Sequence, residues 1–382
     1  MRIAVVHSFY SSAQPSGENR VVVDQVAALR AAGHDVLLLG RYTDREQASP
    51  LYPLKAALTV ATGWGADPTE SLRAFDPDVV HIHNLFPNIG TAWLRRWKGP
   101  VVVSVHNYRS VCSNGLLFRD GKPCTECVTD GPMRAITHRC YRDSVVATIP
   151  VALSRSRDGR YLLERADAVV TTSQSSDDVL KTVVSRDLRT VVIPNAGADE
   201  GRAPLPTLER SGWIALGRLS PEKGFAELVR EWPAGRTLTL IGDGEEEAEI
   251  RSAIGTRSID FRGSVPREEL RELLPTFTGL VFPSLWPEAA PQVVVEAMRV
   301  GLPVVAHEGN GVAGLVADTG AGLAYRDAAT LSAALGLVEA DCDAFSDRAR
   351  HTYVANWTPE VWLRSMTDVY ARLMPSAASG RQ

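Results

Sequence analysis

The chain has 382 residues, of which 45% are hydrophobic and 23% are charged, an ordinary balance for a globular protein with room for two domains. Its net charge of −4 argues against a dedicated nucleic-acid binder, because such domains are usually strongly basic. No run approaches the roughly 18–20 apolar residues of a membrane span. The N-terminus leads directly into an apolar segment without the regions of a signal peptide, so we expect a cytoplasmic protein.

Short β-branched runs alternate with helical patterns along the first half of the chain. An apolar run at Ile3–Val6 precedes a predicted helix at Arg20–Ala32. Further strand-like runs follow at Val36–Leu39, Val79–Ile82, Val101–Val105 and Ala168–Thr172. This alternation predicts a parallel sheet whose strands are joined by helical crossovers.

The second half repeats the same alternation. Its predicted strands are Trp213–Leu216, Thr237–Ile241, Ile259–Arg262, Leu280–Phe282 and Pro303–Ala306. We therefore predict an α/β protein of two Rossmann-like domains, at 1–196 and 207–358. The junction at 197–207 is rich in Gly, Ala, Pro and acidic residues, and the tail at 375–382 is predicted to be disordered.

Two glutamates stand out in the second half, within the run VFPSLWPEAAPQVVVEAMRVGLPVV at Val281–Val305. A helix is predicted to begin around Pro291 and to end before Gly301. Glu288 lies in the loop that opens this helix, and Glu296 lies one or two turns inside it. A helix N-terminus favours anions, because its free N–H groups and its dipole point outward. Carboxylates placed there for sugar hydroxyls, beside a bound phosphate, predict a nucleotide-sugar site.

A second motif lies upstream, in a predicted strand, turn and helix start at Trp213–Gly224. It presents two cations, Arg218 and Lys223, five residues apart. A diphosphate leaving group needs such cations where no metal does this work, because negative charge develops on the leaving oxygen. The alternative is an ordinary pair of solvated charges.

The motifs GRLSPEKG and PEAAPQVVVEA together resemble family 4 of the retaining glycosyltransferases, whose signature is the E-x7-E pair. Other segments match in the same order, at Arg2–His7, Val192–Asn195, Leu240–Gly244 and Phe261–Pro266. The resemblance covers nearly the whole chain. It implies the GT-B fold, in which two Rossmann-like domains face a central cleft. The C-terminal domain would hold the nucleotide sugar, the N-terminal domain the acceptor, and a last helix at 360–375 would cross back to the first domain.

The resemblance also implies roles for the four charged residues of the two motifs. Arg218 and Lys223 would bind the diphosphate and stabilise it as it leaves. Glu288 would contact hydroxyls of the transferred sugar, and Glu296 would accept the ribose hydroxyls of the nucleotide. The loop after Glu288 departs from the usual Gly-Phe-Pro of the family. This loop would still offer N–H groups to the donor, and Ala290, Pro291 and Gln292 would be donor-binding residues.

Three further positions match the family in the resemblance. His106 ends a predicted strand and would lie beside the donor sugar. Gly17 stands in the loop after the first strand and would let a phosphate or acceptor approach the backbone closely. Val265 lies in the loop near the nucleobase. His81 and His83 also end a strand, and they are either acceptor-side residues or ordinary strand-end histidines.

Four cysteines follow one another as C-x11-C-x2-C-x12-C, at Cys112, Cys124, Cys127 and Cys140. Together they predict either a structural zinc site or a set of reduced cysteines in a long insertion. His138 is an alternative ligand. Disulfides are disfavoured in a cytoplasmic chain.

The stretch after this insertion is basic and is either a solvated helix face or a contact with an anionic acceptor or a membrane surface. Its arginines are Arg134, Arg139, Arg142, Arg155, Arg157, Arg160 and Arg165.

The function implied by the resemblance is retaining transfer of a sugar from a nucleotide diphosphate sugar to a hydroxyl acceptor, without a catalytic metal. Polysaccharide units, lipid-linked sugars and secondary metabolites all fit as acceptors. Two alternatives remain open from the sequence. One is a phosphorylase or epimerase on the same fold, and the other is a non-catalytic sugar-nucleotide-binding subunit.

Overall fold

The computed structural model consists of two compact units, one built on each predicted half of the chain. The first unit comprises Met1–Leu117, Cys124–Asn195 and the chain from Trp362 onward, and the second comprises Phe118–Pro123 and Ala196–Val361. The structure describes residues 1–12, 17–155, 160–184, 187–197, 206–286, 288 and 291–374. Ala290, most of the predicted junction and the predicted disordered tail lie outside these residues.

The first unit is built on a six-stranded parallel sheet in the order β2-β1-β3-β4-β7-β8. Its strands are β1 (Arg2–Phe9), β2 (Asp35–Tyr42), β3 (Val79–Asn84), β4 (Val101–Val105), β7 (Ala168–Thr171) and β8 (Thr190–Val192). Residues 3–9 of β1 are all buried, as expected for a strand between two neighbours in a sheet covered on both faces.

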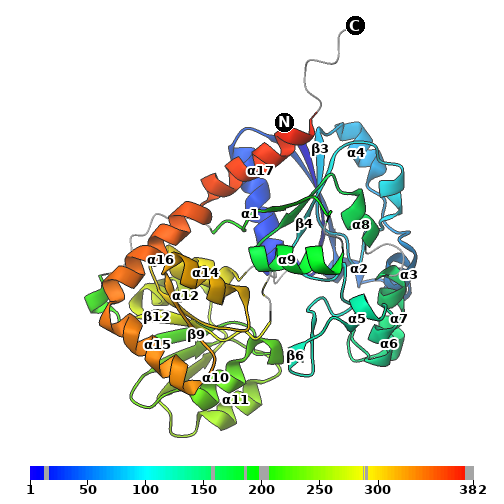
Figure 1. Ribbon diagram of the computed structural model, residues 1–382. Helices are drawn as coiled ribbons and strands as arrows, with labels where there is room; N and C mark the ends of the chain where they lie inside the picture. Colours follow the sequence, from blue (N-terminus) through cyan, green and yellow to red (C-terminus); the bar gives the residue numbers. More distant parts are fainter. Residues whose placement is uncertain are drawn as a thin grey trace. The chain divides into compact units, whose positions relative to one another are not determined.

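Helices join the strands of the first unit, as the alternation predicts (Figure 1). They are α1 (Gly17–Ala31), α2 (Thr43–Glu46), α3 (Tyr52–Thr62), α4 (Thr69–Phe75), η1 (Ala92–Arg95), α5 (Glu126–Thr129), α6 (Arg134–Thr137), α7 (Val145–Ser154), α8 (Arg160–Arg165) and α9 (Gln174–Val183). From Trp362 on, the last helix, α17 (Pro359–Leu373), also belongs to this unit, and Tyr370 is fully buried in it. A short antiparallel hairpin, β5 (Phe118–Arg119) and β6 (Lys122–Pro123), interrupts the chain between Cys112 and Cys124.

The second unit has its own six-stranded parallel sheet, in the order β11-β10-β9-β12-β13-β14. The strands are β9 (Trp213–Leu216), β10 (Leu238–Ile241), β11 (Ile259–Gly263), β12 (Gly279–Phe282), β13 (Val304–His307) and β14 (Gly322–Tyr325). The helical elements are η3 (Thr207–Glu209), η4 (Pro221–Lys223), α10 (Phe225–Glu231), α11 (Glu247–Ile254), α12 (Arg267–Leu273), η5 (Leu274–Thr276), α13 (Gln292–Arg299), α14 (Gly311–Thr319), α15 (Ala328–Ala340) and α16 (Cys342–Asn356).

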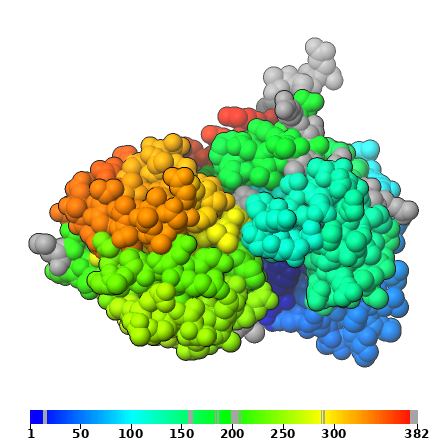
Figure 2. Space-filling model, turned by 60° about the horizontal axis from the view of Figure 1, so that its bottom comes forward, coloured from blue at the N-terminus to red at the C-terminus, as the bar shows by residue number. Residues whose placement is uncertain are grey.

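Strand alternation divides the core of the second unit into two layers. Ile214 and Leu216 of β9 point to one face, where α13, α14 and α16 contribute apolar residues. Trp213 and Ala215 point to the other face, against α10, α11 and α15. In Figure 2, orange residues of the helices that follow β13 cover part of the surface of this unit, and α15 contacts α16 there. Because β9 is buried on both faces, its sequence reads as a continuous apolar run.

The predicted α/β class with two parallel sheets is confirmed. All the predicted strands are present with small shifts at their ends, and β8 and β14 are additional strands that the sequence analysis did not predict. The predicted helix after Pro291 is α13, which ends at Arg299.

Candidate functional site

The two charged motifs meet at the carboxyl edge of the second sheet. Strands β9 and β12 are neighbours there, and each is followed by a motif loop. Their backbones touch, because Leu285 N–H donates to Glu222 O at 2.9 Å. Gly224 makes this approach possible with a φ of +68°, and a Cβ at this position would lie 2.4 Å from Pro283 O. The sequence therefore brings the two motifs together through a glycine turn.

Lys223 and Glu288 form an ion pair that links the two loops. The side chain of Glu288 is only 7% exposed and that of Lys223 is 22% exposed. Ser284 Oγ donates a second hydrogen bond to Glu288 Oε1, at 2.8 Å. The Lys223 ammonium also lies over the Trp286 ring, 5.4 Å from its centroid. The predicted pair of a diphosphate-binding cation and a sugar-binding carboxylate is thus one connected group.

Arg218 is held by the same turn, through an ion pair of 2.6 Å to Glu222 Oε1. Glu222 is buried and also accepts from Ser220 Oγ at 2.8 Å, whereas 62% of the Arg218 side chain is exposed. The guanidinium therefore keeps donors free for a ligand while one edge is fixed. The sequence analysis did not single out Glu222 as a site residue, although it lies within the SPEK motif.

Glu296 lies on α13 and pairs with Arg267 at the start of α12, at 2.9 Å. Its side chain is 23% exposed, so this carboxylate is less buried than the apolar residues around it suggest. Gln292 begins the same helix and Pro291 precedes it. Val265 packs on the edge of the core layer that contains α13.

The first unit holds a chain of histidines at the carboxyl ends of β1, β3 and β4. His83 Nδ1 lies 2.9 Å from His106 Nε2. His81 contacts Ser104 Oγ at 2.8 Å and Tyr370 OH at 2.7 Å, which satisfies both ring nitrogens. Burial, with a smaller effect of His7, lowers the pKa of His106 to about 3. The His83–His106 pair is therefore neutral near pH 7 and shares one N–H between two rings.

Glu18 was missed by the sequence analysis, and it bonds Asn107, the residue that follows His106. It stands in the first turn of α1, next to the predicted Gly17, whose own position is exposed. Asn107 Nδ2 donates to Glu18 Oε2 at 3.2 Å. Burial raises the pKa of Glu18 to about 7, against the lowering effects of Asn107 and Arg109. A carboxyl that titrates near neutral pH can exchange a proton with a bound hydroxyl.

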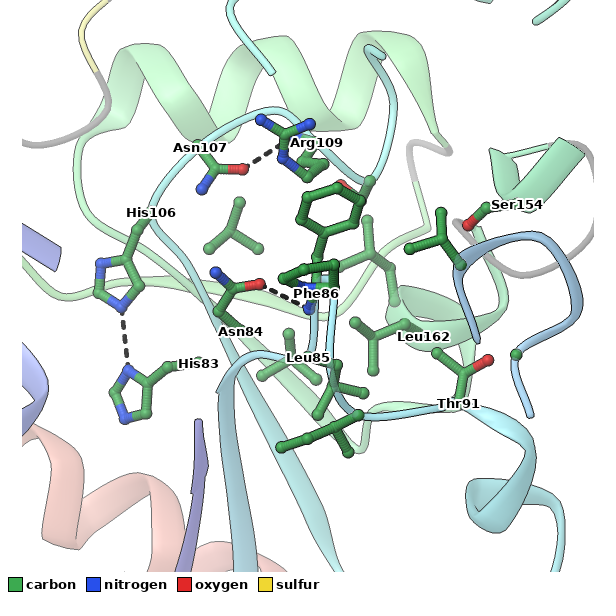
Figure 3. Close-up of a pocket in the computed structure, with 18 of the residues that line it drawn as sticks. His83, Asn84, Leu85, Phe86, Thr91, His106, Asn107, Arg109, Ser154 and Leu162 are labelled. Carbon is green, nitrogen blue, oxygen red and sulfur yellow. Dashed lines mark hydrogen bonds between the residues drawn. The ribbon is translucent and has the colours of Figure 1, made fainter. Parts of the chain in front are cut away.

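A pocket of about 130 Å³ opens beside the His83–His106 pair. Figure 3 shows His83 and His106 at one end and Ser154 and Leu162 at the other. Arg109 lies along its side, over the Phe86 ring at 4.5 Å from the centroid. Most of the remaining lining is apolar. The pocket can thus take a molecule with a polar end and an apolar body.

The predicted zinc site is not supported. No group of three or more His, Cys, Asp or Glu side chains comes together to hold a metal in the part of the chain that the structure describes, which includes all four cysteines. Cys112 Sγ donates instead to Asn114 Oδ1 at 2.9 Å, and His138 pairs with Glu126 at 2.7 Å. Burial raises the pKa of Cys127, which disfavours the thiolate that zinc requires.

Among the described residues, none of the helices has the length and apolar character needed to cross a membrane.

Comparison with known proteins identifies both halves of the chain. A family model described as "Glycosyl transferase 4-like domain" matches residues 16–196, and one described as "Glycosyl transferases group 1" matches residues 210–341. The glycogen synthase of Mycobacterium tuberculosis is 27% identical over 380 residues, covering 92% of this chain and 89% of that protein. A GDP-mannose-dependent alpha-mannosyltransferase from the same species is 26% identical over 355 residues, covering 85% and 83%.

Among solved structures, the sucrose-phosphate synthase of Thermosynechococcus elongatus superposes with a TM-score of 0.68 at 20% identity, covering 97% of this chain and 98% of that one. This likeness supports the GT-B fold. The two family matches follow one another in the order of the two units and together span most of the chain. The chain therefore belongs to the family 4 glycosyltransferases and is an enzyme that transfers a sugar from a nucleotide sugar.

Proposed function

We propose that the carboxyl edge of the second sheet binds the donor, and that the enzyme retains the anomeric configuration without a catalytic metal. The observation that carries this proposal is the Lys223–Glu288 ion pair, which joins the two motif loops at a buried point of the edge. In this arrangement each cation of the site already holds a carboxylate. A bound diphosphate would take over that anionic role.

The four charged residues then divide the donor between them. Arg218 and Lys223 hold the diphosphate, Glu288 accepts hydroxyls of the transferred sugar, and Glu296 accepts the ribose hydroxyls. The same donor contacts the backbone around Pro291 and Gln292, and the base lies near Val265. Ala290 and Gly17 complete the proposed set.

The proposed reaction is a front-face displacement. The bond between the anomeric carbon and the diphosphate oxygen breaks, and its electron pair stays on the diphosphate. The acceptor oxygen bonds to the same face of that carbon, and its proton passes to the departing diphosphate. Arg218 and Lys223 stabilise the charge that develops on the leaving oxygen, an effect worth roughly 10²–10³ in rate for one well-placed donor. These two cations make a catalytic metal unnecessary.

We assign the acceptor to the first unit, at 1–196, and the donor to 207–358. His106 is neutral at pH 7 and paired to His83, so it can donate or accept one hydrogen bond to a sugar hydroxyl. The acceptor presents a hydroxyl, and its chemical class is taken up below.

The experiment is to follow donor turnover by NMR, with and without EDTA, using wild-type protein and the Arg218→Ala variant. An α-linked donor that gives an α-linked product, at equal rates with EDTA, is the expected result. Inversion at the anomeric carbon, or loss of turnover on chelation, contradicts the proposal. Arg251→Ala is the matched control, because Arg251 also pairs with a glutamate four residues away, at 2.9 Å, on an exposed helix of the same unit. Only Arg218→Ala should slow turnover.

A further inference from the structure

Large exposed apolar side chains gather in one region of the first unit. Nine of the twelve in the described part of the chain lie on α3, on α7, within two residues of these helices, or at the start of α6, which packs against α7. They are Leu51, Leu54, Leu58, Trp64, Met133, Val145, Val146, Ile149 and Leu153. Exposed apolar residues are ordinary when scattered singly, whereas a gathered set marks an interaction surface. This concentration needs an explanation beyond the packing of the unit.

The two helices carry these residues at helical spacing. Leu51, Leu54 and Leu58 follow one another at three and four positions, so they share one side of α3. On α7, Val145, Ile149 and Leu153 recur at four positions, and Val146 is 77% exposed. The helices pack against each other (Figure 1). We call these seven side chains the apolar face: Leu51 at the N-cap of α3, two on α3 and four on α7. A surface helix normally turns such a stripe toward the core.

The pocket beside the histidine pair is lined by the ends of the same two helices. Thr59, Val60 and Gly63 come from the end of α3, and Ser154 comes from the end of α7. The apolar end of the pocket, at Leu162, lies away from His83 and His106 (Figure 3). A volume of about 130 Å³ is close to that of cavities that hold one small hydrocarbon group. The apolar face and the acceptor-side pocket therefore share two helices, α3 and α7.

Cations accompany the apolar face. Lys55 lies between Leu54 and Leu58 on α3, and its side chain is 61% exposed although it pairs with Glu46. Arg139 and Arg142 are exposed before α7, and neither forms an ion pair within the described residues, although Asp143 is their neighbour. Exposed apolar residues with basic neighbours match a membrane surface with anionic headgroups. Lysine is depleted at protein interfaces, so Lys55 fits a protein partner less well.

We propose that the apolar face docks on the surface of an anionic lipid bilayer and that the acceptor is a hydroxyl-bearing molecule with a hydrocarbon part, taken up from that surface. The leucines and valines enter the headgroup boundary while Arg139 and Arg142 contact lipid phosphates. The hydrocarbon part next to the acceptor hydroxyl occupies the apolar end of the pocket. The docking surface is independent of the proposed donor site, and the acceptor class rests on the proposed function.

The test is flotation of the full-length protein with vesicles of phosphatidylcholine alone and of phosphatidylcholine mixed with phosphatidylglycerol. Wild-type protein should float with the mixed vesicles, and less so at high salt. The Leu54→Glu/Leu58→Glu variant should lose at least about tenfold in bound fraction, because two apolar contacts become charges. Arg139→Glu/Arg142→Glu should lose binding to the mixed vesicles through charge reversal.

The matched control is Leu337→Glu/Val354→Glu in the second unit. These side chains are 59% and 48% exposed, against 61% and 54% for Leu54 and Leu58, so the added charge and the exposure are nearly equal. The control should float like wild-type protein. Equal loss in both variants, or no flotation of wild-type protein, overturns the proposal. Dimerisation abolished by Leu54→Glu/Leu58→Glu, without vesicle binding, would assign the face to a second copy of the chain.

Nucleotide binding in the same variants separates this proposal from the proposed function. Circular dichroism melting checks that each variant is folded. Variants that bind nucleotide normally and fail to float support the docking surface alone. If hydrocarbon-free glycosides accept the sugar as efficiently as lipid-linked ones, the acceptor class is wrong even where docking holds.

Discussion

Replacing Lys223 by methionine should separate the structural role of the Lys223–Glu288 pair from its catalytic role. The substitution keeps the apolar stem and removes the charge, which leaves Glu288 buried with 7% of its side chain exposed. Breaking a buried pair in this way typically costs about 3–5 kcal/mol. The Ser284 hydroxyl still donates to Glu288, and Lys223 itself is partly exposed, so we expect a smaller loss, about 2–3 kcal/mol.

Adding Glu288→Gln should restore most of that stability, because the neutral amide no longer needs a cation and can still bond Ser284. Turnover should not return, since the diphosphate has lost its ammonium. We expect kcat to stay at least about 100-fold below wild type in both variants. Urea unfolding and steady-state kinetics measure the two effects.

Lys181→Met is the control, because Lys181 also pairs with a buried carboxylate, that of Asp177, at 2.7 Å in the first unit. It should lower stability and leave kcat unchanged. Either of two results would refute the reasoning: a Lys223→Met enzyme with wild-type turnover, or a double variant that regains activity.

Three further predictions use other parts of the structure. Burial raises the pKa of Glu18 in the folded chain from 4.5 to about 7. The free energy of unfolding therefore falls as the pH rises from about 4.5 to about 7, where the unfolded chain has lost this proton and the folded chain still holds it. Relative to wild type, the unfolding free energy of Glu18→Gln should therefore rise by up to roughly 3 kcal/mol between pH 5 and pH 8. Parallel curves of unfolding free energy against pH for the two proteins would contradict this. Gly224→Ala should destabilise the second unit, because its Cβ would lie 2.4 Å from Pro283 O. Gly235→Ala has no atom within 4 Å of its Cβ, so it should be destabilised only by the backbone strain of an alanine at φ +82°. Glu296→Ala should weaken donor binding with a stability change within about 1 kcal/mol, and an equal effect of Arg267→Ala would show that the ion pair, not a ribose contact, matters.

The buried strands could be predicted from the sequence because their apolar runs are continuous. In β1 and β9 nearly every residue is buried, so periodicity and composition point to the same element. β8 has only three residues and β14 mixes Gly and Ala with Leu and Tyr, so neither gives such a signal. The charged loops could be predicted because turn residues and cations follow a strand directly.

Long-range partners could not be predicted in this way. From the sequence alone, Glu222 and Glu18 look like exposed acidic residues. Their burial and their hydrogen-bond partners depend on segments that are distant in the sequence. The cysteine spacing left structural zinc and reduced cysteines open, because the positions of the thiols depend on how the insertion folds, which spacing does not fix. The exposure of the apolar side of α3 could not be predicted either, because helical spacing does not show which side of a helix faces solvent. A cytoplasmic location stays a prediction.

The most direct test of the donor site is calorimetric titration of wild-type protein and Glu296→Ala with UDP, GDP and ADP. The account predicts saturable binding of one base series to wild-type protein without added metal, and at least about tenfold weaker binding to the variant. Binding of none of the three, or equal affinity in wild type and variant, would contradict the assignment of the second-unit edge as the donor site.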